Sequence, residues 1–348
     1  MQPQQAMKQS FGPVTQWLAD MPKAELHLHI DGSLSAERML SLAEKNGVKL
    51  PYSTIEEVKA AYQFVDLQSF LDLYYLGASV LRESEDFYWL MKDYLDVCRQ
   101  QKIVHCEIMV EPQTYLPNGV ELPVVMDGFK QAIAEAKSEW GQSVVLILSF
   151  LRHLPEADCL ATLDQAEPFR DDFHAIGLAS SEKDFPPENF VNLYSEAAKR
   201  GYALTAHAGE EGTADYVRTA LAALNVKRID HGVRSSDDPD LMKDLIDQQI
   251  PLTVCPLSNV RLCVYSHMRE HNILEMLKDR VCVTVNSDDP AYFGGHLLEN
   301  FAALEEHLGM DKPQALALVR NSFEAAYLHA GDRGRFLQSL DYYCEVNG

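Results

Sequence analysis

The residues of this chain that could do chemistry are histidines and acids at or just after the ends of short apolar runs. Imidazole nitrogens and carboxylate oxygens are ligands of divalent metal ions such as zinc. If the apolar runs are neighbouring strands, side chains at their ends converge on one place, where distant residues can share a single ion. The candidates are His27, His29, His207, His231, Asp288 and Asp289.

His27 and His29 lie two residues apart in the first apolar run. Because alternate side chains of a strand point to the same face, both imidazoles can reach the same ion. A pair of this kind is also compatible with a purely structural role. The metal interpretation therefore depends on the other candidates.

His207 and Glu210 lie at the end of another run, in the sequence TAHAGE. The imidazole can bind a metal ion while Glu210, past a glycine, leans toward that ion without binding it. A free carboxyl group beside an activated water can carry protons between the water and a substrate nitrogen. Alternatively, Glu210 and Glu211 begin a helix, where the macrodipole favours acidic side chains.

His231 could be a further ligand, or it could orient a water and stabilise developing charge. Asp288 and Asp289 are adjacent, so one can bind metal while the other accepts a hydrogen bond from a substrate. Asp-Asp-Pro is also typical of a helix start, with an Asp cap and Pro290 at the first helical position. Three imidazoles and one carboxylate suit zinc with an open position for water. That ligand set is His27, His29, His207 and Asp288.

Eight short apolar or β-branched runs can position these residues. Their continuous apolar character suits strands that are buried on both faces, and helical spacing between the later runs predicts parallel strands with right-handed crossovers. We therefore expect an α/β fold, a metal-dependent (β/α)8 TIM barrel in which residues 1–348 form a single domain. The runs are residues 25–30, 103–110, 144–152, 175–180, 203–208, 228–233, 251–255 and 281–286.

The long interval between the first and second runs predicts an inserted helical cap at about residues 52–101. Helical spacing is found there over residues 53–62, 67–81 and 84–101. Because the insertion follows the first strand, it leaves from the C-terminal face and is expected to lie over the barrel mouth. We expect four aromatic residues of this interval to pack in the core in preference to forming a substrate-facing lid; they are Phe64, Phe70, Tyr74 and Tyr75.

Composition excludes several classes of partner. Asp and Glu number 52 against 30 Lys and Arg, and a formal net charge of −22 repels nucleic acid and anionic lipid. No stretch approaches the roughly 18 apolar residues of a membrane span. The N-terminal segment lacks a signal-peptide pattern, so we expect a cytoplasmic protein. The seven cysteines, an odd number without a CxxC motif, are expected to be reduced and buried.

Five segments together resemble the adenosine/adenine deaminase family of the amidohydrolase superfamily: ELHLHIDGS, TAHAGEE, RIDHGV, VCPLSN and NSDDP. The resemblance extends over about residues 18–328. It implies a barrel in which His27, His29, His207 and Asp288 hold one zinc ion per chain and need no organic cofactor. It further implies that Glu210 donates a proton, that His231 activates a water, and that Asp289 bonds a purine ring nitrogen.

The reaction that this resemblance implies is hydrolytic deamination of a small-molecule aminopurine. Residues 177–182 and 254–264 look most like the branch that converts the free base adenine to hypoxanthine and ammonia. Ser180 and Ser181 would place bulk and hydroxyl groups where a nucleoside carries its ribose, so they are predicted to bind substrate. Asp31, Ala179 and residues 109–113 depart from the pattern of that branch.

Three alternatives stay open on the sequence. N6-substituted adenines or adenosine could be the substrate instead of adenine. A related metal hydrolase of lactones or phosphoesters is disfavoured. Those enzymes commonly recruit a second metal through a lysine or glutamate after the fourth strand, and here that strand ends in residues 179–182, with no lysine at its end. In a different class, the barrel could be a catalytically inactive, metal-stabilised binding protein, although such a site would not require Glu210.

Overall fold

Eight parallel strands form one sheet in the order β1 to β8 in the computed structural model, which describes residues 11–347. The sheet closes where His29 N donates to Asp288 O at 3.0 Å and Asp288 N donates to His27 O at 3.2 Å. The predicted TIM barrel is therefore confirmed. The strands are β1 (Lys23–His29), β2 (Ile103–Val110), β3 (Ser143–Leu151), β4 (Phe173–Ala179), β5 (Ala203–Ala208), β6 (Arg228–His231), β7 (Leu252–Val254) and β8 (Val283–Val285).

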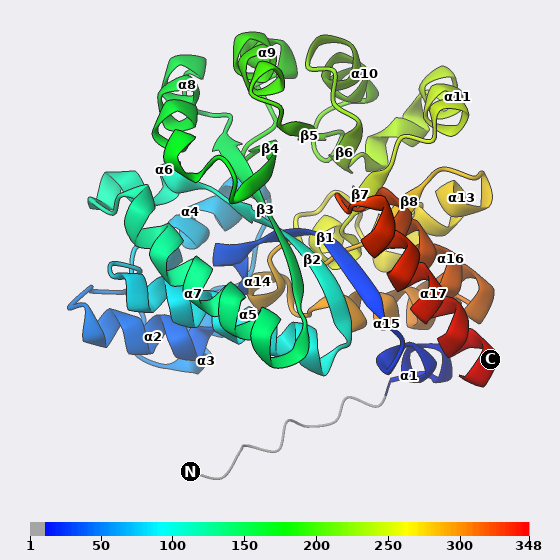
Figure 1. The fold of residues 1–348 in the computed structure, drawn as a ribbon, viewed down its shortest axis with the longest axis horizontal. Helices are drawn as coiled ribbons and strands as arrows, with labels where there is room; N and C mark the ends of the chain where they lie inside the picture. The colour runs from blue at the N-terminus through cyan, green and yellow to red at the C-terminus, as the bar shows by residue number, and fades with distance from the viewer. Residues whose placement is uncertain (1–10, 348) are drawn as a thin grey trace.

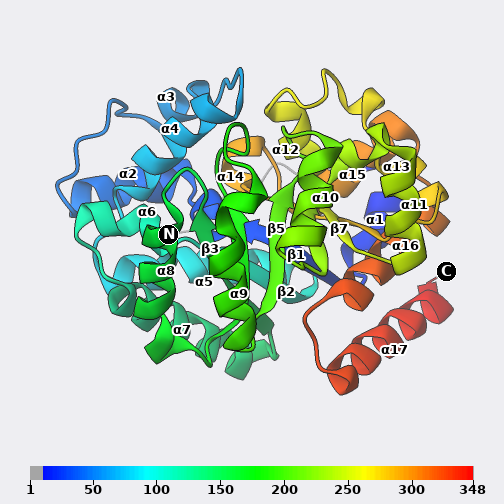
Figure 2. The same ribbon diagram turned by 90° about the horizontal axis from the view of Figure 1, so that it is seen from above.

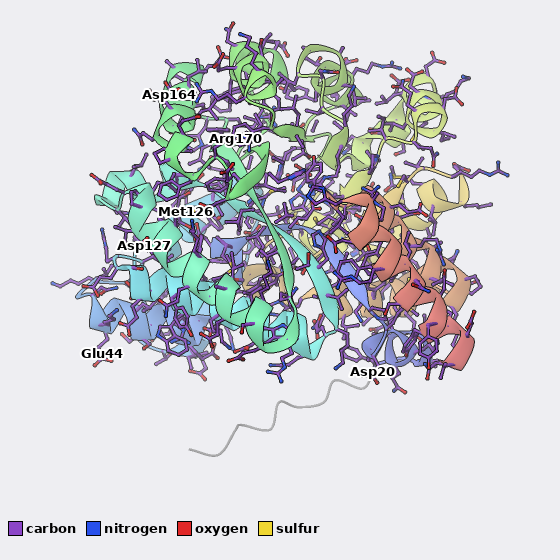
Figure 3. All side chains as sticks on the ribbon, viewed as in Figure 1. Asp20, Glu44, Met126, Asp127, Asp164 and Arg170 are labelled. Atoms are coloured by element: carbon purple, nitrogen blue, oxygen red, sulfur yellow. The ribbon has the colours of Figure 1, made fainter. Side chains whose placement is uncertain are left out.

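Helices surround the strands, and α8 to α11 follow one another along the outside of the barrel (Figures 1 and 2). They are α1 (Pro13–Ala19), α2 (Ala36–Lys45), α3 (Ile55–Ala60), α4 (Leu67–Ala78), α5 (Ser84–Gln100), α6 (Pro112–Tyr115), α7 (Leu122–Trp140), α8 (Glu156–Gln165), α9 (Val191–Lys199), α10 (Ala214–Ala223), α11 (Pro239–Gln248), α12 (Pro256–Arg261), α13 (Ile273–Lys278), α14 (Pro290–Phe293), α15 (Leu297–Leu308), α16 (Lys312–Ala325) and α17 (Ala330–Asn347). Side chains fill the space between these ribbons, and the labelled acids Asp20, Glu44 and Asp164 lie exposed at the periphery (Figure 3).

The last three strands are shorter than the runs that predict them. The run 228–233 ends at His231, because Gly232 adopts a left-handed conformation (φ 72°) and the chain continues as a 3-10 helix. The run 251–255 narrows to β7, since Cys255 already precedes α12. An apolar run predicts which residues are buried, but a strand ends where its main chain stops pairing with the neighbouring strand.

The interval predicted as a cap contains α3, α4 and α5. Helix α4 begins with a capping box, in which the Asp66 side chain accepts from Ser69 N at 2.8 Å and the Ser69 hydroxyl oxygen accepts from Asp66 N at 3.3 Å. Helix α5 packs against α7 on the outside of the barrel, whereas α4 contacts the segment that follows β1. Helices α2, α3 and α4 lie together at one side of the molecule in both ribbon views (Figures 1 and 2).

The two ends of the described chain lie side by side. Trp17 of α1 donates its indole N–H to Asn347 O at 2.9 Å, and the Tyr343 hydroxyl donates to Trp17 O at 2.7 Å. The segment predicted not to be a signal peptide falls mainly outside the described residues. Among residues 11–347, no helix combines the length and apolar character that crossing a bilayer requires.

The seven cysteines are free thiols, but they are not all buried. Cys98, Cys106, Cys159 and Cys255 are buried, whereas Cys263 is exposed and Cys282 and Cys344 are partly exposed. The prediction of burial is therefore wrong for three of them. Cys263 lies in a turn after α12 with a φ of 62°, and Cys344 lies on the outer helix α17, where it is only partly buried against the core.

Candidate active site

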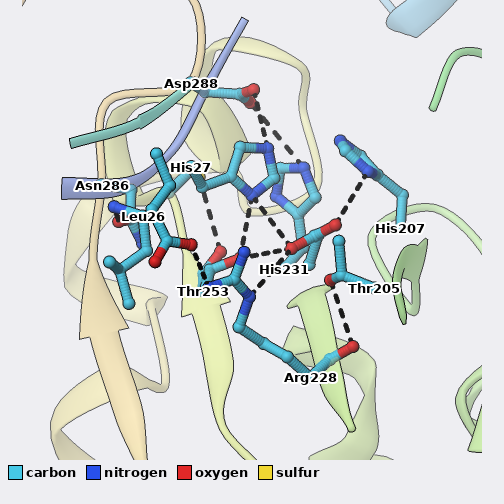
Figure 4. A network of polar contacts seen from close by, with 12 residues as sticks. Leu26, His27, Thr205, His207, Arg228, His231, Thr253, Asn286 and Asp288 are labelled. Atoms are coloured by element: carbon cyan, nitrogen blue, oxygen red, sulfur yellow. Dashed lines mark hydrogen bonds and ion pairs between the residues drawn. The ribbon is translucent and has the colours of Figure 1, made fainter. Parts of the chain in front are cut away.

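Ligand atoms from four residues at the C-terminal end of the barrel lie within 4.8 Å of one another: His27 and His29 of β1, His207 of β5, and Asp288 after β8. Oδ1 of Asp288 lies 3.2 Å from Nε2 of His27 and 3.4 Å from Nε2 of His29. Figure 4 shows His27, His207 and His231, from three different strands, gathered beside Asp288. The structure thus brings the predicted ligand set together.

The outer nitrogens of two of these imidazoles face carboxylates. Nδ1 of His29 lies 2.8 Å from Oε1 of Glu111, and Nδ1 of His207 lies 3.5 Å from Oδ2 of Asp230. A carboxylate accepts but does not donate, so each Nδ1 carries the proton. The two Nε2 atoms, which lie only 3.2 Å apart, therefore present their lone pairs to each other.

His27 reaches Asp230 through a hydroxyl group. Nδ1 of His27 lies 2.9 Å from Oγ1 of Thr253, and that hydroxyl donates to Oδ1 of Asp230 at 3.0 Å. Because the hydroxyl has one proton, His27 must be the donor in the first contact. Burial alone would raise the pKa of Asp230, but the nearby imidazoles of His207 and His27 and the charge of Arg228 hold that pKa well below its usual value. One ionised carboxylate therefore orients two imidazoles.

This arrangement fits a metal ion. Nε2 of His27 is buried without a hydrogen-bond partner, and the three Nε2 lone pairs and the Asp288 carboxylate converge with no donor between them. A divalent cation would bind all four, and outer hydrogen bonds that fix the imidazole orientation are typical of metal-bound histidines. A second possible group of ligand atoms overlaps the first and consists of His27, His231, Cys255 and Asp288.

A chain of hydrogen bonds places the proton of His231 on the nitrogen that faces the cluster. Ile273 N donates to Nδ1 of His271 at 3.2 Å, so Nε2 of His271 is the donor to Oδ1 of Asn259 at 3.2 Å. Nδ2 of Asn259 then donates to Nδ1 of His231 at 3.3 Å. Nε2 of His231 therefore carries a proton, and burial lowers the pKa of this imidazole well below its usual value, so it stays neutral. A protonated nitrogen cannot bind a metal ion, which disfavours the ligand group that contains His231.

Glu210 lies beside the cluster without belonging to it. Its Oε2 lies 3.5 Å from Nε2 of His231, and the residue is 4% exposed. Burial raises the pKa of Glu210 well above its usual value, and the charges of Asp288 and Glu182 raise it further. This carboxyl group therefore retains its proton to a higher pH than an ordinary glutamate, as a proton donor requires.

A cavity of about 430 Å³ opens beside these groups, and Asp289 and Ser180 line it together with Glu210. Oδ1 of Asp289 is buried without a hydrogen-bond partner, and burial and the adjacent Asp288 raise the pKa of Asp289. Gly32 lets the main chain after β1 lie close to Asp289, because a Cβ at position 32 would lie 2.0 Å from Oδ1 of Asp289. Ser181 is not among the residues that line the cavity.

Phe70 and Tyr74 belong to the buried core, as predicted, and Tyr75 packs against it, but all three also line the cavity. They do so because positions 67, 70, 71 and 74 share one face of α4 and this face is turned toward the barrel mouth. The hydroxyl oxygens of Tyr75 and Ser180 lie 3.1 Å apart, and Nδ1 of His153 lies 2.8 Å from the same Ser180 oxygen. Phe64 packs behind them, with its ring centroid 5.4 Å from that of Phe70.

Two of the candidate residues have a strained main chain. His231 has a φ of 62° and Asp288 a φ of 64°, a left-handed conformation that costs a residue with a Cβ about 1–2 kcal/mol. Such conformations persist where the surrounding structure imposes them, and they cluster at functional sites. Both residues lie at the ends of strands, where the turn aims each side chain into the cluster.

Sequence reasoning missed Glu111, Asp230 and Glu182 as parts of this site. Glu111 orients His29, Asp230 orients His27 and His207, and the Glu182 carboxylate accepts four main-chain hydrogen bonds from residues 209–212. Each of these three acids lies in a predicted strand or just after one. This position near the barrel rim was the only feature of the sequence that could have indicated their role. Arg152, at the end of β3, donates to the carbonyl oxygens of His207 and Phe185.

Comparison with known proteins places this fold and site in a family. The profile of the family described as Adenosine deaminase matches residues 22–343. An adenine deaminase from Hahella chejuensis is 52% identical over 329 residues, which cover 94% of this chain and 98% of the relative. The crystal structure of an adenine deaminase from Arthrobacter aurescens is 42% identical, with a TM-score of 0.91 over 93% of this chain and 99% of that one.

A second solved structure, a zinc-bound amidohydrolase from Burkholderia ambifaria, has a TM-score of 0.88 and covers 98% of this chain and 96% of its own. At 22% identity it supports the fold alone. The match to the family profile covers most of the described barrel, including every predicted ligand. The chain therefore belongs to the adenosine deaminase family.

Proposed function

We propose that this protein is a metal-dependent aminohydrolase that converts adenine and water to hypoxanthine and ammonia. The observation that carries the proposal is the position of Glu210, a buried carboxyl group 3.5 Å from Nε2 of His231 and outside the four-residue ligand cluster. A site that bound a metal only for stability would not need this group. The relatives named adenine deaminase, at 52% and 42% identity, support adenine as the substrate.

His27, His29, His207 and Asp288 would hold the metal, and we propose one zinc ion per chain, because three imidazoles and a carboxylate suit this ion. When bound, zinc would supply an activated water as the nucleophile near neutral pH. Glu111 and Asp230 keep the ligand nitrogens deprotonated toward the ion by accepting the Nδ1 protons of His29 and His207.

Glu210 would donate a proton to the purine ring nitrogen next to the amino-bearing carbon. Protonation there lets the ring give up aromaticity as the oxygen of water adds to the carbon. The hydroxyl proton of this adduct then passes to the amino group, which leaves as ammonia while the carbonyl of hypoxanthine forms. The raised pKa of Glu210 favours the protonated acid that this step needs. The protonated Nε2 of neutral His231 would donate a hydrogen bond to the oxygen on which negative charge develops, which stabilises the transition state.

Asp289 and Ser180 are proposed to position the base. The unpartnered Oδ1 of Asp289 faces the cavity and can bond a second purine nitrogen, with the direction of that bond set by the protonation state of the carboxyl group. Ser180, held between Tyr75 and His153, would lie along the edge of the purine where a nucleoside carries its ribose. Ser181, predicted for the same role, lies outside the cavity lining, so its side chain gains no support from the geometry.

Enclosure of the cavity favours a free base over a nucleoside. Phe70, Tyr74 and Tyr75 of α4 cover the cavity from the side of the cap. A ribose would have to displace the contact between Tyr75 and Ser180.

Ammonia release from adenine, adenosine, N6-methyladenine and isopentenyladenine, measured with the zinc-loaded protein, tests the proposal. We expect adenine to have the highest kcat/KM. Faster deamination of adenosine or of an N6-substituted base would move the substrate assignment to that compound. No release from any aminopurine by protein that retains its metal would support an inactive, metal-stabilised binding protein instead.

We further propose that the enzyme acts in the cytoplasm on a small-molecule substrate and has no nucleic-acid partner. The net charge of −22 would repel a phosphate backbone. Fractionation of cells that express the native protein tests the location, and recovery in the membrane fraction would contradict it.

A further inference from the structure

One carboxylate, that of Glu182, accepts hydrogen bonds from four successive main-chain N–H groups. Oε1 accepts from Gly209 at 2.6 Å, and Oε2 accepts from Glu210 at 3.0 Å, Glu211 at 2.9 Å and Gly212 at 2.8 Å. These four residues follow β5 and include the proposed proton donor. No other element supplies an acceptor to this run of N–H groups among the main-chain and side-chain hydrogen bonds of residues 11–347.

The contact is enclosed and sterically specific. Glu182 is 1% exposed, so water does not compete for its oxygens. A Cβ at position 212 would lie 2.6 Å from Oε1 of Glu182, so only glycine lets the loop close around the carboxylate. Hydrogen bonds to an ionised acceptor are about twice as strong as neutral ones, which makes this group of four a rigid clamp on the loop.

Glu182 also joins the two sides of the cavity. It lies two residues after Ser180, which lines the cavity at the end of β4, and its carboxylate holds the main chain of Glu210 after β5. The same short segment, residues 180–182, therefore sets the positions of Ser180, which is proposed to lie along the purine, and of the proton donor Glu210. The Glu182 side chain does not line the cavity, so any effect on the reaction passes through the loop.

We propose that Glu182 is a positioning residue for the deamination: by clamping the amides of residues 209–212, it holds the Glu210 carboxyl group in reach of the substrate nitrogen. This inference rests on the proposed function, because it assumes that Glu210 carries the proton. A displacement of about 1 Å of a reacting group can cost about 10²-fold in rate. Loss of the clamp should therefore act on kcat, while the metal ligands and the base-binding groups stay in place.

The test compares Glu182→Ala and Glu182→Gln in the full-length, metal-loaded enzyme, with Glu305→Gln as the matched control. Glu305 on α15 also accepts main-chain hydrogen bonds with its carboxylate, from Val14 at 2.9 Å and Thr15 at 2.8 Å, but it does not line the cavity beside the proposed metal ligands. Metal content, thermal midpoint, kcat and KM for adenine, and amide hydrogen exchange of the peptide containing residues 209–212 are measured for each protein.

For Glu182→Ala we expect a loss of about 10²-fold in kcat with KM for adenine and metal content close to wild type, and faster amide exchange confined to residues 209–212. Glu182→Gln should be intermediate, because its amide keeps one oxygen acceptor but turns an NH2 group toward a main-chain N–H. Glu305→Gln should lower the thermal midpoint without changing kcat.

Three results would overturn the inference: an unchanged kcat in folded, metal-loaded Glu182→Ala; a loss of activity that follows metal content; or amide exchange at residues 209–212 equal to wild type. Failure of the proposed function is separate, since wild-type enzyme and Glu305→Gln would then also release no ammonia from adenine. In that case the exchange measurement still decides whether Glu182 clamps the loop.

Discussion

Nδ1 of His29 lies 2.8 Å from Oε1 of Glu111, and this contact decides which nitrogen of the imidazole is free for a metal ion. Burial would lower the pKa of His29, but the charge of Glu111 and the hydrogen bond to it raise this pKa. Nδ1 keeps its proton against Glu111, and a bound metal ion would take the place of the second proton on Nε2. The same relationship between a carboxylate and a ligand histidine is found for Asp230 and His207, at 3.5 Å.

Glu111→Gln should weaken zinc binding about 10–100-fold, the usual loss when the outer partner of a metal-binding histidine is removed. A glutamine amide can present its NH2 group to Nδ1 and so favour the wrong tautomer of His29. Competition with a chelator of known affinity measures the effect. An affinity equal to wild type would mean that Glu111 does not orient the ligand.

His207→Ala should remove the metal, because it deletes one of four converging ligands and leaves two histidines and a carboxylate. Metal content by elemental analysis is the measurement, and His174→Ala, at an exposed position of β4, is the matched control. About one metal ion per chain in purified His207→Ala would contradict the proposed ligand set.

Glu210→Gln should reduce kcat by about 10²–10⁴-fold with metal content and adenine binding retained, because only proton transfer is lost. Glu211→Gln makes the same chemical change one residue along, on a side chain that does not line the cavity, and should be close to wild type. Steady-state kinetics and binding of adenine to the inactive variant provide the comparison. Unchanged turnover in Glu210→Gln would remove Glu210 from the mechanism.

Tyr75→Phe should raise KM for adenine, with a smaller effect on kcat. The variant loses the 3.1 Å contact with Ser180 and leaves the aromatic ring in place, so the cost should be near that of one hydrogen bond, about 0.5–1.5 kcal/mol. Tyr88→Phe, which removes the hydroxyl that donates to Glu135 on the outside of the barrel, is the control. A KM unchanged in Tyr75→Phe would show that the contact does not help to close the site.

Glu107→Gln should destabilise the fold more at pH 7 than in acid. Burial would raise the pKa of Glu107, but Arg228, whose guanidinium donates to it at 2.5 Å, and His105 hold that pKa below the usual value. A carboxyl group with a lowered folded-state pKa stabilises the protein above its unfolded-state pKa, and this contribution is lost as the pH falls through the folded-state value. Removing one partner of a buried ion pair costs about 3–5 kcal/mol.

Urea unfolding of wild type and Glu107→Gln at pH 7 and at pH 4, with chelator present at both, measures that difference. Asp172→Asn, which removes the partner of Lys130 in a solvent-exposed ion pair, should change the free energy of unfolding by about 1 kcal/mol or less. A difference between wild type and Glu107→Gln that is the same at both pH values would contradict the assigned pKa direction.

Local sequence patterns were sufficient for the barrel and for the proposed ligand set. Strand β1 is buried along its whole length, and the alternation of a strand puts His27 and His29 on one side whatever else the chain does. Parallel strands with helices between them bring their C-terminal ends to the same rim, so His207 and Asp288 had to lie near that pair. These features follow from main-chain geometry, which short segments of sequence encode.

Tertiary structure alone decided which side chains orient the ligands and which face of α4 covers the cavity. Glu111 meets His29 across 82 positions of sequence, and Glu182 meets Gly209 across 27. Such contacts depend on the stagger of neighbouring strands and on loop paths, where an error of one residue turns a side chain to the other face. The sequence by itself therefore determined the fold and the proposed ligand set, whereas the proton positions on His27, His29 and His231 came from partners that only the closed barrel brings into contact.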